Sequence, residues 1–192
     1  MKIPALALSI VLFSLASFGQ GFGRTAAFNA VSVKAVATNS QSCITWVVQT
    51  NANDYFDSAI GVLSQSISNQ SASAQTICQV DAFLNGIGGS CQVYFQIWTA
   101  QNKGGSQWGG NSNTNSVLNT GDAWYTFSFP TANRPVTTGS TTFYLTLQTT
   151  GANSVAWDLS NANPYGGVSY QAFTGSGGNS SDDYAFKIYD LQ

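Results

Sequence analysis

The sequence predicts an all-β fold, an antiparallel β-sandwich formed by a single domain. Beyond about residue 20 the chain consists of short runs in which apolar residues occupy every second position. Turn residues separate these runs at intervals of roughly 8 to 15 residues, which is typical of sandwiches. We find no run with the length and 3.6-residue period of a helix after the N-terminal segment.

The stretch Thr76–Thr99 predicts a β-hairpin with its turn at Asn85–Ser90. Because successive side chains of a strand point to opposite faces, its second strand has an apolar and a mixed face. The apolar row, which we expect in the core, is Cys91, Val93, Phe95 and Ile97. The outward row carries Tyr94 and Trp98.

Further strands follow the same alternation in chain order. Thr142–Thr149 is the clearest, with Phe143, Leu145 and Leu147 inward and Tyr144 outward. The remaining predicted strands are Ala30–Val36, Cys43–Gln49, Ala59–Ile67, Trp124–Phe129, Ser154–Leu159, Val168–Phe173 and Tyr184–Tyr189.

Residues 1–19 have the pattern of a secretory signal peptide: a basic start, an apolar run, and small residues before a cut after Gly19 or Ala16. Residues 20–58 form an N-terminal extension, which either adds strands to the same domain or pairs with a neighbouring molecule. Residues 59–192 form the sandwich. We expect a secreted, extracellular protein without a membrane span.

The composition excludes several kinds of chemistry. The chain has no histidine and no glutamate, and its acids are eight aspartates. A Ser-His-Asp or Cys-His centre and an imidazole metal site are therefore impossible. Six basic residues cannot neutralise a run of phosphates, so we expect no nucleic-acid partner. Only 7% of the residues are charged, against about 25% in an average protein, which suits an extracellular β-protein.

Three cysteines follow the signal segment, and outside the cell a disulfide is expected. In the predicted hairpin Cys78 and Cys91 are roughly 20 Å apart, whereas a bridge needs Cα atoms within about 7 Å. Cys43 therefore pairs with Cys78 or with Cys91. The third thiol is either a buried free cysteine or a crosslink between subunits.

A series of motifs follows in order between Ala59 and Asp190. They are Gln65-Ser66-Ile67, Cys91–Trp98, Trp124–Phe129, Gly139–Leu145, Trp157, Asn163–Gly167 and Asp183–Tyr189. With these motifs the chain resembles bacterial secreted jelly-roll modules of the choice-of-anchor type, which are similar in shape to galactose-binding-like domains. The resemblance implies a jelly-roll topology. Most of the matching positions are core and turn residues, so they specify the fold better than the activity.

The polar, aromatic surface favours a non-catalytic carbohydrate-binding or adhesive module. Aromatic rings stack on the apolar faces of sugars, and amide side chains pair with hydroxyl groups. The candidate ligand-binding residues are Tyr94, Trp98, Trp108, Trp124, Tyr144, Trp157 and Tyr165. Some of these rings have a structural alternative: the N-terminal segment covers them, Trp108 folds back on the core, or Trp157 and Tyr165 close the end of the sandwich.

Two other functions stay open in the sequence. The unmatched N-terminal strands and the odd cysteine suit a structural subunit of an extracellular fibre or matrix, assembled from copies of the chain. Catalysis is disfavoured, because the adjacent aspartates Asp182 and Asp183 point to opposite faces of a strand. A calcium site would use Asp57, Asp158 and Asp183. No loop shows a spaced run of aspartates, so we expect these residues to cap turns and we expect no cofactor.

Overall fold

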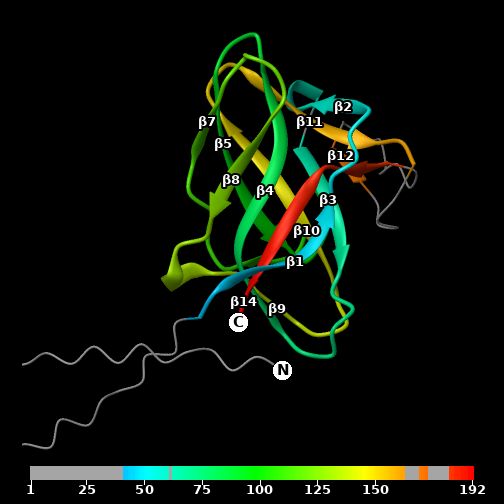
Figure 1. Cartoon of the computed structure of the whole chain (residues 1–192), viewed down its shortest axis with the longest axis vertical. Coiled ribbons are helices and arrows are strands. Elements are labelled where there is room, and N and C mark those ends of the chain that lie inside the picture. The colour runs from blue at the N-terminus through cyan, green and yellow to red at the C-terminus, as the bar shows by residue number, and fades with distance from the viewer. Residues whose placement is uncertain (1–40, 61, 163–168, 173–181) are drawn as a thin grey trace, which may run out of the picture. The chain divides into compact units, whose positions relative to one another are not determined.

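A computed structural model describes residues 41–60, 62–162, 169–172 and 182–192 of the chain (Figure 1). The predicted signal peptide, the predicted strand Ala30–Val36 and Tyr165 lie outside the described residues. Among the described residues the regular structure is β-strand, with three short 3-10 turns and no α-helix. No helix in this part of the chain is long and apolar enough to span a membrane.

The strands form two sheets, and all of their pairings are antiparallel. The first sheet has the order β1-β14-β4-β11-β13, with β2 beside β11 and with β8 and β9 beside β4. Its strands are β1 (Cys43–Gln49), β2 (Asp54–Asp57), β4 (Gln75–Ile87), β8 (Ala123–Ser128), β9 (Val136–Thr137), β11 (Ser154–Ser160), β13 (Asp183–Tyr184) and β14 (Phe186–Leu191).

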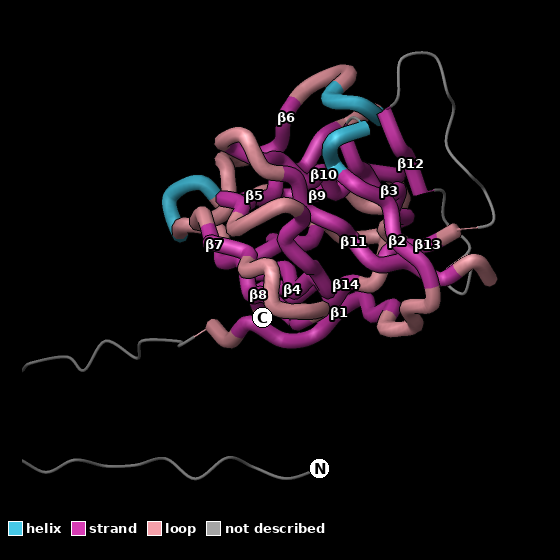
Figure 2. The backbone as a smooth tube through the Cα atoms, turned by 90° about the horizontal axis from the view of Figure 1, so that it is seen from above, coloured by secondary structure: helices cyan, strands magenta, loops and turns pink. Residues whose placement is uncertain are grey.

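The second sheet has the order β12-β3-β10-β5-β6, with β7 beside β5. Its strands are β3 (Val62–Ser68), β5 (Cys91–Trp98), β6 (Gln107–Trp108), β7 (Asn115–Val117), β10 (Thr142–Thr150) and β12 (Ser169–Ala172). The 3-10 turns are η1 (Ser58–Ile60), η2 (Gln101–Lys103) and η3 (Thr131–Asn133). Seen from above, the two sheets are separate layers, so the predicted β-sandwich is confirmed (Figure 2).

The core lies between the two layers and contains the inward rows of both sheets. Phe95 of the second sheet is its centre: its ring contacts Phe127 at 4.8 Å and Trp157 at 5.2 Å between centroids, both edge to face. Trp157 in turn stacks on Tyr184 at 4.2 Å. Edge-to-face contacts of this kind add about 0.5–1.5 kcal/mol to the burial of the rings.

The predicted hairpin is wrong. The strands β4 and β5 are consecutive, but β4 belongs to the first sheet and β5 to the second. Gly88 and Gly89 between them have φ angles of 73° and 145°, which few residues other than glycine adopt, and the chain crosses there from one layer to the other. Each strand still buries one apolar row, because both layers face the same core.

The N-terminal strands belong to the sandwich. Strand β1 pairs with β14, and β2 pairs with β11, both in the first sheet. Of the two alternatives for this segment, the structure has extra strands of the same domain, so residues 43–57 are not separated from the sandwich that the sequence predicts from residue 59.

The predicted disulfide exists as Cys43–Cys78, with a Cα–Cα distance of 6.1 Å, and joins β1 to β4. The third cysteine, Cys91, is a buried free thiol that donates a hydrogen bond to the carbonyl oxygen of Asn153 over 3.1 Å. Burial, and secondarily the negative charge of Asp57, raise the pKa of this thiol. A buried thiol cannot reach a second subunit, so the crosslink is the wrong alternative.

Candidate ligand-binding face

The outer face of the second sheet gathers three of the predicted aromatic residues. Strands β5 and β10 are neighbours, and Tyr144 lies directly opposite Trp98. Tyr94 lies on the same face, four residues from Trp98, which is about 13 Å along the strand. All three rings are half-buried, with their inner neighbours fully in the core. We call this surface the amide–aromatic face; it consists of Gln92, Tyr94, Gln96, Trp98, Tyr144, Gln107 and Asn111.

Amide side chains hold the aromatic rings in place. The indole Nε1 of Trp98 donates to Oε1 of Gln96 over 3.1 Å. Nε2 of Gln96 donates in turn to Oδ1 of Asn111 over 2.8 Å, and Nε2 of Gln107 donates to the same oxygen over 3.1 Å. The network fixes the rotamers of Trp98 and Gln96 before any ligand arrives, which reduces the entropy cost of binding.

The far end of strand β10 is covered. Thr146 lies opposite Gln96 and Gln148 opposite Tyr94, so both point outward, as the alternation predicts. Both are nevertheless buried. The turn η2 lies against β10 and β3. Lys103 of this turn donates from Nζ to Oε1 of Gln148 over 3.1 Å. Lys103 therefore adds one exposed positive charge at the margin of the face.

Trp108 and Trp124 lie elsewhere. Trp108 of β6 is half-buried, packs against the core and has its ring 6.3 Å from that of Phe143. Trp124 of β8 is 38% exposed but lies on the outer face of the first sheet, 5.2 Å from the ring of Phe83. The Nζ of Lys187 sits 4.2 Å above the Trp124 ring.

The predicted aromatic residues therefore do not form one site. Strand β8 pairs with β4, so Trp124 faces away from Trp98 across the thickness of the sandwich. Trp157 is wrong as a ligand contact: it is 0% exposed, and its Nε1 donates to the carbonyl oxygen of Ala185 over 3.0 Å. Tyr165 lies outside the described residues. Alternation predicts that a ring points outward, but not from which sheet.

The aspartates proposed for calcium are not gathered. Asp183 is buried between the sheets and accepts a hydrogen bond from Gln65. Asp158 lies on the outer face of the first sheet. Asp57 accepts a hydrogen bond from the backbone N–H of Ala59. Over the described ranges, no group of three or more aspartates or cysteines is arranged to hold a metal ion.

Comparison with known proteins finds that no family model matches the chain and that no curated protein matches it. The resemblance to choice-of-anchor modules thus stays a prediction from the motifs.

Proposed function

We propose that the protein is a secreted, non-catalytic carbohydrate-binding or adhesive module, and that glycans bind on the amide–aromatic face. The observation that carries the proposal is the direct opposition of Trp98 and Tyr144 on neighbouring strands, with Tyr94 on the same face. Sugar rings offer C–H faces to such aromatic rings. Gln96, Gln107 and Asn111 surround the rings and supply the donors and acceptors that hydroxyl groups need.

The rest of the molecule is consistent with this role. The Cys43–Cys78 disulfide is of the kind that oxidising compartments permit, which agrees with the predicted signal peptide. The partners would be glycans or another cell-surface polymer. No cofactor is needed, because binding through stacking and hydrogen bonds involves no bond cleavage.

A glycan array with the mature protein, followed by titration calorimetry with the best glycan, tests the proposal. We expect Trp98→Ala and Tyr144→Ala each to weaken binding about tenfold or more, since one lost stacking contact of about 1.4 kcal/mol is a factor of ten. Trp124→Ala is the matched control: it removes a comparable ring from the opposite sheet and should change the Kd less than twofold.

Two results would overturn the proposal. The first is the absence of binding to any glycan by a protein that unfolds cooperatively. The second is binding that Trp98→Ala and Tyr144→Ala leave unchanged, or that Trp124→Ala weakens equally. Thermal unfolding of each variant separates a lost contact from a lost fold.

The edge strand β1 favours a second candidate, a structural subunit of a fibre or matrix. It stands at the end of the first sheet and exposes Ile44 and Val48, which are 41% and 49% accessible. An edge strand with apolar side chains can pair with a second copy of the chain. Size-exclusion chromatography distinguishes the two candidates. A series of oligomers that grows with concentration, and that Val48→Lys abolishes, supports the structural subunit. A monomer at all concentrations supports the binding module.

A further inference from the structure

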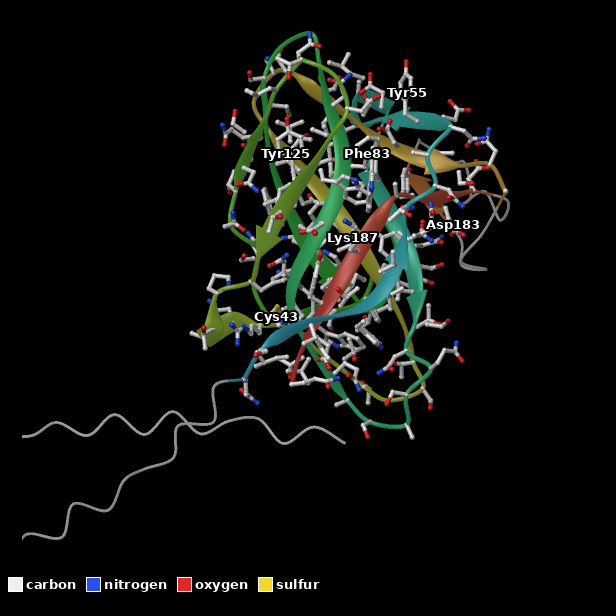
Figure 3. All side chains as sticks on the ribbon, in the orientation of Figure 1. Cys43, Tyr55, Phe83, Tyr125, Asp183 and Lys187 are labelled. Atoms are coloured by element: carbon white, nitrogen blue, oxygen red, sulfur yellow. A yellow bond between two sulfur atoms is a disulfide. The ribbon has the colours of Figure 1, made fainter. Side chains whose placement is uncertain are left out.

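A cavity of about 230 Å³ opens on the outer face of the first sheet, away from the amide–aromatic face. Its walls include Tyr55 of β2, Phe83 of β4 and Asp158 of β11, together with Asp54 and Asp122. Figure 3 places Tyr55 and Phe83 toward the same end of this sheet. Among the described residues, none of those that line the cavity is basic, whereas two are aromatic and three are aspartates, so the cavity is aromatic and acidic.

The strand register builds this arrangement. Tyr55 lies directly opposite Asp158. Trp157 lies opposite Leu84 and points into the core, so the adjacent residues Asp158 and Phe83 point outward beside each other. The result is a row across three strands in which one carboxyl group sits between two aromatic rings.

Asp158 is the unusual member of this row. It is only 6% exposed, and its Oδ2 has no hydrogen-bond partner among the described residues. The buried Oδ1 of Asn85, two residues from Phe83 on the same face, is also without a partner in that part of the structure. A buried acceptor without a donor costs about 1–3 kcal/mol, and more when it is charged. A ligand that donates hydrogen bonds to Oδ2 of Asp158 and Oδ1 of Asn85 would remove this cost.

We propose that this cavity binds a protonated primary amine, whose N–H groups donate to Asp158 and whose charge lies against the rings of Tyr55 and Phe83. An ammonium group supplies the donors that the buried carboxylate lacks, and aromatic faces attract cations. On the same face, Lys187 already lies above the ring of Trp124 in this way. The site is on the opposite sheet from the amide–aromatic face and does not depend on glycan binding there.

Other ligand classes fit less well. Calcium takes about six to eight oxygen ligands, and no three acids of the described residues are arranged for a metal. A quaternary ammonium ion has no N–H group and would leave Oδ2 of Asp158 without a donor. A neutral alcohol donates one hydrogen bond but does not compensate the charge of an ionised Asp158 in a buried position.

The proposal implies that binding depends on pH. Burial, and secondarily the charge of Asp122, raise the pKa of Asp158 to about 7. The charged groups around it are Asp54 from β2 and Asp122 from the segment before β8, with Lys187 on β14 held over Trp124. An amine binds the ionised carboxylate, so affinity should rise as the pH passes upward through 7.

The test is a titration of the mature protein with n-butylammonium at pH 8, followed by NMR or calorimetry. We expect saturable binding that is at least tenfold tighter than that of tetramethylammonium, n-butanol or Ca²⁺. We expect Asp158→Asn to weaken it at least tenfold. The matched control Asp57→Asn removes the same kind of charge from the neighbouring strand β2. Asp57 does not line the cavity, so this variant should change affinity less than twofold.

Asp158→Asn removes a buried, unpaired charge, so this variant should fold at least as well as the parent. Phe83→Leu is a second cavity variant, and we expect it to weaken amine binding by about threefold. Glucosamine and Nα-acetyllysine amide, titrated alongside, distinguish a saccharide amine from a lysine side chain. The proposal is overturned if n-butylammonium does not saturate, if tetramethylammonium or Ca²⁺ binds equally well, or if both cavity variants bind like the parent.

Discussion

Gln65 of the second sheet donates a hydrogen bond of 2.8 Å from Nε2 to Oδ1 of Asp183 in the first sheet. Its Oε1 also accepts from the backbone N–H of Tyr184 over 2.9 Å. Both side chains are fully buried, so one amide joins the two layers through the core. Most of the surrounding contacts are apolar and carry no direction, whereas these two bonds fix how the sheets are aligned.

Gln65→Ala should therefore lower the free energy of unfolding by about 3 kcal/mol, because it leaves a buried carboxylate and a buried N–H without this partner. Urea unfolding measures the change. The control Gln70→Ala removes an exposed glutamine nearby and should cost less than about 0.5 kcal/mol. Equal effects of the two substitutions would contradict the role of Gln65.

The double substitution Cys43→Ser with Cys78→Ser should lower the unfolding free energy by about 4 kcal/mol. The disulfide closes a loop over a sequence separation of 35 residues, and the loss follows from the entropy that the unfolded chain regains. Comparison of the parent and the variant in urea, both without reductant, measures it. A difference within the error of the extrapolation would show that the bridge does not constrain the unfolded chain as expected.

Thiol labelling should report zero reactive groups in the native protein, one after denaturation and three after denaturation with reductant. The pattern follows from one buried free thiol at Cys91 and one disulfide. Mass spectrometry of the labelled peptides identifies each site. Rapid labelling of the native protein would contradict the burial of Cys91.

Raising the pH from about 5 to 8 should destabilise the parent protein relative to Asp158→Asn. In the fold the pKa of Asp158 is about 7, against an ordinary value of 3.8, with burial as the main cause and Asp122 as the second. Between these values the folded protein retains a proton that the unfolded chain has released, so stability falls as the pH rises. From pH 5 to 7 this loss is at most about 3 kcal/mol.

Urea unfolding of both proteins at pH 5 and pH 8 measures this difference. The gain from Asp158→Asn should be larger at pH 8, where the carboxyl group of the parent must ionise in the fold. An equal difference at the two pH values would contradict the shifted ionisation of Asp158.

The sequence predicts which residues face the core, but not which strands are neighbours. The alternation in Cys91–Trp98 and in Thr142–Thr149 places Phe95 and Leu145 inward as observed. Strand β4 also has an apolar row. That row is compatible with a hairpin in which β4 pairs with β5, and equally with the observed arrangement, in which the chain crosses after β4 to the opposite sheet. The choice depends on contacts between residues distant in sequence, which local periodicity does not contain.

The same limit applies to the candidate sites. Trp98 and Tyr144 could be predicted as outward residues, but their direct opposition depends on the pairing of β5 with β10. The cavity at Asp158 has one local signal, a carboxyl group between Trp157 and Leu159 in an otherwise mostly apolar strand. Its partner Tyr55 is about a hundred residues earlier in the chain, and only the register of β2 with β11 brings them together.

The Cys43–Cys78 bridge also determines how the domain responds to mechanical load. A force applied to the chain ahead of Cys43 passes through the sulfur atoms directly into β4, which is flanked by β14 and β11 on one side and β8 on the other. The intervening residues are shielded from tension. At about 3.5 Å per residue, 35 residues correspond to roughly 120 Å of contour length that stays locked until the bridge is reduced. A domain that is pulled at its N-terminal end would extend by that much less before it fails.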